Sequence, residues 1–306
     1  MTKRNGSNTA ASVRQRLLNK SRESHTDFNL ILNRYGLERF LYRLSRSAYG
    51  ARFILKGAML FPLWGVYSFR STRDIDLLGF GDNDIQALED VFREMCQVEA
   101  EDDGILFNKD SVKAEDIRDQ LEYGGTRIRF TADLAGALIS LQVDIGFGDA
   151  VTPEAVEADF PTMLDHPAPH LRVYPPETVI AEKFQAMVKL GIANSRMKDF
   201  FDIWMLNKAF EFDGAILCQA VQSTFERRKT EIPEGIPVAF STEFSEDKQK
   251  QVQWKAFLRK TKPETMPGNL QSVLDGLIRF MMPVLDALRH KKMLKKTWNI
   301  DSGTWQ

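Results

Sequence analysis

Apolar residues recur at helical spacing over the first fifty residues, and we expect helices at about 11–23 and 25–47. Residues 1–10 are polar and lack this period, so we expect a disordered tail there. Short apolar runs at 52–56, 75–80 and 137–149 are typical of buried strands, and the acidic stretch at about 83–98 has helical spacing. Strand-like pieces also occur at 105–107, 112–117 and 122–130. This mixture predicts an α+β fold with a small mixed sheet flanked by helices.

Prolines crowd residues 151–175, where we expect a loop and a domain boundary. From Pro176 onward the pattern is helical, with segments at about 177–190, from 196 to 206, and then at 212–226, 245–259 and 268–296. We therefore expect an α+β domain with N-terminal helices over 11–175 and a helical C-terminal domain over 176–306, in which residues 211–306 are all-helical.

The composition excludes several classes of protein. The chain has 306 residues and 43% hydrophobic residues, which is ordinary for a globular protein, and no apolar run reaches about 18 residues, so we expect no membrane-spanning helix. The N-terminus lacks the apolar core of a secretory signal. Two cysteines, Cys96 and Cys218, are too few for a disulfide framework or a zinc site, which fits a reducing cytoplasm.

Charge is distributed unevenly along the chain. Residues 1–50 contain ten Lys or Arg against three Asp or Glu, and residues 248–306 contain twelve against four. Because the net charge is −1, the middle of the chain is strongly acidic. Two basic ends favour contact with a polyanion such as nucleic acid, although basic helical surfaces also serve solubility alone.

Asp74 and Asp76 stand two residues apart at the start of the strand around Ile75 and Leu77. Alternation along a strand places both carboxylates on one face and the apolar residues on the other. Adjacent carboxylates repel each other unless a cation lies between them, and Mg²⁺ commonly takes one or two carboxylates together with substrate phosphates. The alternative is a solvated strand end with two surface acids.

Two further features surround this pair. Lys56 and Gly57 lie at an expected turn from a strand into a short helix, where a glycine allows a phosphate to approach the backbone. Asp144 comes late in the apolar strand at 137–149 and is a candidate third metal ligand. Each has an ordinary alternative, namely a simple strand-to-helix turn and a strand-end acid that faces water.

The second half of the chain contributes Lys183, Asp199 and Asp202. Lys183 lies on a mostly apolar helix, and Asp199 and Asp202 are three residues apart, so they share a helix face. A buried carboxylate here needs a basic partner, for which Arg196, Lys198 and Lys183 are candidates. A helix-start acid with a salt bridge is the structural alternative.

Taken together, these motifs resemble the AbiEii/AbiGii-type nucleotidyltransferase toxins. The resemblance covers roughly residues 30–207 and rests on four segments: Lys56-Gly57, Arg70-Ser71-Thr72-Arg73-Asp74-Ile75-Asp76, Glu182-Lys183, and Arg196-Met197-Lys198-Asp199-Phe200-Phe201-Asp202. Ala58 and Met59 depart from the family pattern, which has a second glycine and a hydroxyl residue there. The loss of the hydroxyl removes one donor to phosphate.

The resemblance implies a polymerase-β-like nucleotidyltransferase core with a helical C-terminal domain. It implies Mg²⁺-dependent transfer of a nucleoside monophosphate from an NTP to RNA, in particular to the 3′ end of tRNA, which blocks translation. It further implies abortive infection, phage defence and pairing with a winged-helix antitoxin.

Roles for single residues follow from the resemblance. Asp74, Asp76 and Asp144 would hold the metal, and Lys183 would neutralise phosphate charge. Asp199 would orient Lys183 or deprotonate the acceptor, with Asp202 as the second choice. The residues that would contact the nucleotide are Lys56, Gly57, Arg70, Ser71, Thr72 and Asp202.

Three competing functions remain at this stage. A small-molecule nucleotidyltransferase of the antibiotic-modifying kind shares the core motifs but does not need two basic ends. A nucleic-acid-binding protein without catalysis explains the basic ends but leaves the three acids without a role. A metal-dependent glycosyltransferase also uses Asp-x-Asp, but then Lys56-Gly57 and Glu182-Lys183 have no role.

Overall fold

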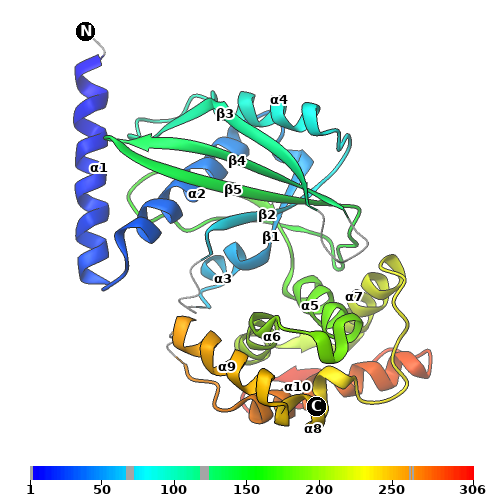
Figure 1. The fold of residues 1–306 in the computed structure, drawn as a ribbon. Coiled ribbons are helices and arrows are strands. Elements are labelled where there is room, and N and C mark those ends of the chain that lie inside the picture. Colours follow the sequence, from blue (N-terminus) through cyan, green and yellow to red (C-terminus); the bar gives the residue numbers. More distant parts are fainter. Residues whose placement is uncertain (1–2, 67–71, 118–123, 262, 264) are drawn as a thin grey trace. The chain divides into compact units, whose positions relative to one another are not determined.

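The computed structural model describes the chain except residues 1–2, 67–71, 118–123, 262 and 264 (Figure 1). Its contacts divide the chain into two units. The first comprises Met1–Trp64, Ser71–Gly148 and Val156–Val173, and the second comprises Asp149–Ala155 and Tyr174–Gln306 with the short stretch after Trp64.

The first unit begins with two helices, α1 (Lys3–Glu23) and α2 (Phe28–Arg46). Helix α1 begins at Lys3, inside the segment expected to be a disordered tail. Ala10 is buried and lies against Gly104, which anchors the early turns of the helix. The side chain of Asp27 caps α2 by accepting hydrogen bonds from the backbone N–H groups of Asn29 and Leu30.

A mixed seven-stranded sheet forms the body of the first unit, in the order β3-β4-β5-β2-β1-β7-β6. Two neighbouring pairs, β2–β5 and β1–β7, are parallel, and the others are antiparallel. The strands are β1 (Phe53–Lys56), β2 (Asp74–Gly79), β3 (Leu106–Ile117), β4 (Gly125–Leu134), β5 (Ala137–Phe147), β6 (Val156–Asp159) and β7 (His170–Val173). The predicted α+β fold is confirmed.

The strands β6 and β7 correct the sequence analysis, which predicted only a loop over 151–175. They pair with each other in an antiparallel register, and β7 extends the sheet beside β1 through Leu55 and Val173. Each has four residues. So short a strand has too few alternating positions to be recognised among prolines.

One face of the sheet is packed against α2 and α4 (Ile85–Met95), and Figure 1 shows both helices beside the sheet. Gly36 of α2 allows close approach, since a Cβ there would lie 3.0 Å from Leu141 Cδ2. Stacked and edge-on aromatic rings join the two layers. These rings belong to Phe40, Phe53, Phe92, Phe107 and Phe130.

A two-residue turn fixes the register of β4 against β5. Ala135 and Gly136 have φ values of 50° and 79°, as the tight hairpin turns that match strand twist require. The pairing of Leu134 with Ala137 then continues to Gly125 opposite Gly146. Every side chain of β4 therefore has a defined partner on β5.

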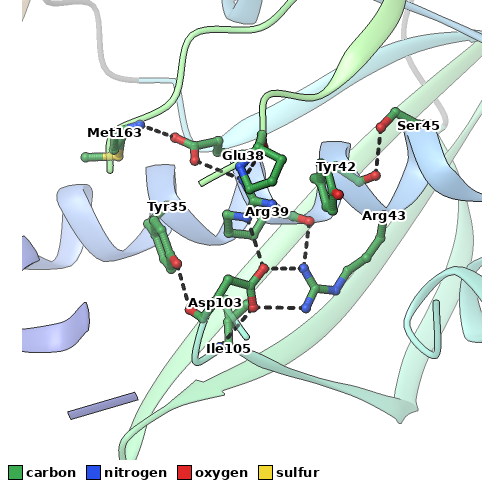
Figure 2. Close-up of polar contacts among 10 residues, drawn as sticks. Tyr35, Glu38, Arg39, Tyr42, Arg43, Ser45, Asp103, Ile105 and Met163 are labelled. Atoms are coloured by element: carbon green, nitrogen blue, oxygen red, sulfur yellow. Dashed lines mark hydrogen bonds and ion pairs between the residues drawn. The ribbon is translucent and has the colours of Figure 1, made fainter. Parts of the chain in front are cut away.

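A buried polar cluster holds α2 to two loops of the first unit (Figure 2). Arg39 and Arg43 donate hydrogen bonds to the carboxylate of Asp103 at distances of 2.6–3.1 Å, and Arg39 also donates to the Pro167 carbonyl. The Oε2 atom of Glu38 accepts from the Met163 backbone N–H at 2.7 Å. Arg39 and Arg43 thus point inward, although the sequence analysis counted them among the basic residues of the N-terminal segment.

The second unit is mostly helical, as predicted. Its helices of five or more residues are α5 (Pro176–Leu190), α6 (Met197–Ala209), α7 (Gly214–Arg227), α8 (Thr242–Glu246), α9 (Lys248–Thr261) and α10 (Leu270–Arg289).

The expectation of an all-helical segment after residue 211 is wrong in one respect, because a three-stranded sheet joins β8 (Phe212–Asp213), β9 (Thr297–Asn299) and β10 (Thr304–Trp305). Trp298 and Trp305 are buried there, pack on Phe280, and donate to backbone carbonyls.

Within the described residues, no helix is both long and apolar enough to span a membrane.

Candidate functional site

The strand register brings two of the predicted acids side by side. Asp76 of β2 lies directly opposite Asp144 of β5, and Asp74 lies opposite Gln142. Residues that are directly opposite on neighbouring strands share a face, and so do residues two apart on one strand. Asp74, Asp76 and Asp144 therefore project from one face of the sheet, while Ile75 and Leu77 are buried on the other.

Gly57 lies against the carboxylate of Asp76. Lys56 is the register partner of Asp76 on β1, and Gly57 follows with a φ of 74°, in the left-handed region. A Cβ built on Gly57 would stand 2.0 Å from Asp76 Oδ2. A turn of 3₁₀ helix (Gly57–Met59) and α3 (Leu60–Leu63) follow, so the expected turn into a short helix is present. The glycine is required here by the carboxylate as well as by the backbone.

Arg127 is a member of this cluster that the sequence analysis missed. Arg127 lies on β4, directly opposite Asp144 of β5. Its guanidinium donates to both carboxylate oxygens of Asp144, from Nε to Oδ1 at 2.8 Å and from Nη2 to Oδ2 at 2.7 Å. The hydrogen bonds to Asp144 raise the pKa of Arg127. The hairpin turn at Ala135-Gly136 is the sequence feature that could have indicated this pair. Counting outward from the turn along both strands places residue 127 opposite residue 144.

The segment before β2 is described only in part. The Thr72 hydroxyl donates to the carboxylate of Asp74, which fixes that side chain at the start of the strand. The predicted phosphate contacts Arg70 and Ser71 lie outside the described residues. Arg73 is exposed.

A divalent cation fits this cluster by the chemistry of its donors. Two carboxylates two residues apart, with a third in register beside them, are the oxygen ligands that Mg²⁺ takes together with substrate phosphates. Among the residues that the structure describes, no three acidic, His or Cys side chains form a group that would already hold a metal. The side chain of Asp144 is bound to Arg127 instead.

The predicted residues of the second unit form a buried ion cluster. Lys183 Nζ of α5 lies 2.8 Å from Asp199 Oδ1 and 2.8 Å from Asp202 Oδ2, both on α6. Both aspartate side chains are fully buried, whereas Lys183 is 13% exposed. Arg196 Nε approaches the other oxygen of Asp199 at 2.7 Å. The i, i+3 spacing of the acids thus places both against one lysine.

The charge state of Asp199 depends on its burial and on its two basic neighbours. Burial disfavours the ionised form of Asp199, but Lys183 and Arg196 outweigh it and hold the pKa of Asp199 below its usual value. Lys183 therefore has an ionised partner at neutral pH. A cation held by two buried carboxylates keeps a fixed position at the surface of the helix pair.

Glu182, the neighbour of Lys183, points to a different set of partners. Its carboxylate accepts from the Tyr174 hydroxyl at 3.2 Å and lies 3.2 Å from Arg228 Nη2. Arg228 also binds Asp149 at 2.9 Å. Only 14% of the Arg228 side chain is exposed, so it lies mostly inside this cluster. Adjacent helix positions point in different directions, which explains the separate roles of Glu182 and Lys183.

The structure thus gathers the predicted residues into two groups, one in each unit. Lys56, Gly57, Thr72, Asp74, Asp76 and Asp144 belong to the first unit, and Lys183, Asp199 and Asp202 belong to the second.

Two solved structures from Helicobacter pylori are distantly similar to the chain. JHP933 is 16% identical with a TM-score of 0.40, and the similarity covers 76% of this chain and 93% of that chain. A protein described as a candidate nucleotidyltransferase is 15% identical with a TM-score of 0.38, over 76% of this chain and 96% of that chain. No curated protein matches the sequence.

The model of one protein family matches residues 39–283, which is most of the chain and includes every described residue of the two groups. That family is described as the nucleotidyl transferase AbiEii toxin of type IV toxin–antitoxin systems. Such a family implies an NTP substrate and an antitoxin partner, and nucleotidyltransferases generally use a divalent metal. The chain belongs to the AbiEii nucleotidyl transferase toxin family.

Proposed function

We propose that this toxin transfers a nucleoside monophosphate from an NTP to RNA, at the 3′ end of tRNA, with Mg²⁺ as the metal, and that this modification blocks translation. The observation that carries the proposal is the register of β2 and β5, which sets Asp76 against Asp144 and places Asp74 on the same face. Three acids on one face of a strand pair have no structural need for one another, and they suit a metal–triphosphate complex.

In this proposal Asp74, Asp76 and Asp144 hold the Mg²⁺. A divalent ion held there would supply Lewis-acid chemistry, namely neutralisation of phosphate charge and a lower pKa for the attacking hydroxyl. Gly57 leaves the carboxylate of Asp76 room to face the site, because any side chain there would displace it. Thr72 holds Asp74 at the strand start. Lys56, the register partner of Asp76 on β1, supplies a positive charge.

Lys183 supplies positive charge for the phosphates in this proposal. Of the two roles considered for Asp199, the geometry favours that of orienting Lys183. A carboxylate with a lowered pKa and two basic partners is a weak proton acceptor, so Asp199 is poorly suited to deprotonate the acceptor. Asp202 holds Lys183 from a second direction.

To test the proposal, the purified protein is incubated with Mg²⁺, total tRNA and one NTP at a time, labelled on its α-phosphate. Wild type is expected to label tRNA, whereas Asp74→Ala and Asp76→Ala are expected to lose at least about a thousandfold in rate, because direct charge stabilisation at the reacting phosphate is removed. Asp116→Asn, an exposed strand acid outside the cluster, is the matched control and should label normally.

Transfer to a small hydroxyl or amino compound with no transfer to any RNA would refute the RNA assignment and favour an antibiotic-modifying activity. Binding of tRNA without any transfer would favour a nucleic-acid-binding protein. Expression in growing cells gives a second readout, since wild type should arrest growth and Asp76→Ala should not.

We further propose a role in phage defence and pairing with a winged-helix antitoxin; the membership of a type IV toxin–antitoxin family supports an antitoxin partner. Co-expression with the neighbouring gene product, followed by recovery of growth, tests the partner directly.

A further inference from the structure

Arg127 occupies a central place in the row of charges that crosses the sheet. Register pairs Lys56 with Asp76, Asp76 with Asp144, Asp144 with Arg127, and Arg127 with Glu115. Both nitrogens of the guanidinium edge bind Asp144, at 2.8 and 2.7 Å. This ion pair is half-buried, with 29% of the Arg127 side chain and 18% of the Asp144 side chain exposed.

Asp144 consequently has a cation already bound to both of its oxygens. Two carboxylates in register, Asp76 and Asp144, destabilise each other unless positive charge is near. A bidentate arginine is among the strongest partners available to a carboxylate. This arginine also directs the carboxylate of Asp144 toward β4. Accordingly, the three aspartates do not form a preformed metal-binding group among the described residues.

We propose that Arg127 is a positioning residue that acts as an internal counter-cation: it holds Asp144 while no metal is bound and competes with the divalent cation for that carboxylate. The inference rests on the proposed function, because it requires Asp144 to be a metal ligand. When a metal takes Asp144, the guanidinium is released on the same face of the sheet, where it would meet the charge of the triphosphate. The competition makes metal binding by the toxin weaker in the absence of nucleotide.

Arg129 provides a matched comparison on the same strand. It stands two residues further along β4, shares the face of Arg127, and forms an ion pair with Glu115. It lies opposite Gln142 instead of an acid of the cluster. Replacing either arginine by glutamine removes one positive charge from this face of the sheet. Only Arg127→Gln also removes the ion pair with Asp144.

The test measures Mn²⁺ binding without nucleotide, by electron paramagnetic resonance of the free ion, for wild type, Arg127→Gln, Arg129→Gln and Asp144→Asn. Arg127→Gln is expected to bind Mn²⁺ roughly three- to tenfold more tightly than wild type, which is the range for loss of a partly exposed bidentate pair. Arg129→Gln should stay within about twofold of wild type, since a surface charge contributes little. Asp144→Asn should bind more weakly.

Thermal unfolding gives an independent readout. Without metal, Arg127→Gln should unfold at a lower temperature than wild type, because Asp144 loses the cation that binds both of its oxygens. Added Mn²⁺ should raise the midpoint of this variant more than that of wild type. If Arg127→Gln does not fold, Arg127→Lys keeps the charge and loses the two-pronged geometry, and it should bind Mn²⁺ more tightly than its matched control Arg129→Lys.

Two results would overturn the inference, and they are distinguishable. If Asp144→Asn weakens Mn²⁺ binding but Arg127→Gln binds no more tightly than Arg129→Gln, the metal site stands and the competition does not. If Asp144→Asn binds as well as wild type, the assignment of Asp144 as a ligand fails, and the inference fails with it.

Discussion

At the scale of single residues, two independent constraints require glycine at position 57. Its φ of 74° suits glycine, and a Cβ would meet the carboxylate of Asp76 at 2.0 Å. Gly57→Ala should therefore lower the free energy of unfolding by about 1–3 kcal/mol, through backbone strain and displacement of the carboxylate. It should also reduce nucleotidyl transfer severely. Urea unfolding and the tRNA-labelling assay measure the two effects.

Gly136→Ala is the control for Gly57→Ala. Gly136 has a φ of 79°, and a Cβ built there meets nothing within 4 Å. This variant should show the backbone cost alone and keep its activity. Equal losses of stability and equal activity in the two variants would mean that contact with Asp76 is unimportant.

Lys183 is the second residue whose removal should have a large effect. Lys183→Met leaves Asp199 and Asp202 buried with one basic partner fewer, and the expected loss of stability is about 3 kcal/mol at neutral pH. The lowered pKa of Asp199 sets the sign of the pH dependence. Its ion pairs stabilise the folded state above the usual carboxyl pKa of about 4, and this contribution is lost as the pH falls through the lower folded-state pKa.

The difference in stability between wild type and Lys183→Met should therefore be largest near neutral pH and shrink below about pH 4. Urea unfolding at a series of pH values measures it. Lys189→Met, an exposed lysine on the same helix, should differ from wild type by less than about 0.5 kcal/mol. A difference that stays constant from pH 7 to pH 3 would contradict the ion-pair explanation.

At the scale of elements, the attachment of α2 to the loop at Met163 depends on Glu38. Burial raises the pKa of Glu38 to about 7, although the Met163 N–H and Arg39 act in the opposite direction. An acid whose pKa is raised on folding stabilises the folded state below its unfolded pKa of about 4.3, and this contribution is lost as the pH rises toward 7. The stability of wild type should fall accordingly over that interval.

Glu38→Gln cannot titrate and should remove this pH dependence. From pH 5 to pH 8 the stability of wild type relative to Glu38→Gln should fall by roughly 2–3 kcal/mol, as measured by urea unfolding. Glu115→Gln replaces an exposed glutamate of β3 and should leave the wild-type profile intact. Parallel profiles for wild type and Glu38→Gln would show that Glu38 titrates near its ordinary pKa.

The elements also show what the sequence could predict. The strands β2 and β5 were predictable because their apolar faces are continuous, and with them the acids Asp74, Asp76 and Asp144. The ion pair of Arg127 depends on a register that only the turn at Ala135-Gly136 sets, and periodicity carries no information about which strands are neighbours. The strands β6 and β7 were missed because they are short and because their partners, β1 for β7 and β7 for β6, are set by the fold.

At the scale of the whole molecule, the basic N-terminal segment divides into inward and outward charges. Arg39 and Arg43 bind Asp103 inside the first unit and are not available to a polyanion. Arg14, Lys20 and Arg22 are exposed on α1, while Arg16 is paired with Asp165. Arg34 and Arg46 of α2 are exposed as well. If the proposed RNA acceptor uses the basic N-terminus, we expect its phosphates to meet α1, which carries three of these exposed cations.

Arg14→Gln combined with Lys20→Gln tests this expectation through the salt dependence of tRNA binding. Each cation that contacts a phosphate releases a counter-ion, so the slope of log K against log salt should become shallower by about 0.7–0.9 for every contact removed. The control is Lys109→Gln combined with Lys189→Gln, two exposed lysines of the acidic middle of the chain, which should leave the slope unchanged. Equal slopes for both double variants would place the RNA elsewhere, and the basic C-terminal residues after α10 would then be the next surface to neutralise. Because the α1 substitutions lie outside both groups of predicted site residues, transfer at saturating tRNA should continue at the wild-type rate, which separates docking of RNA from chemistry.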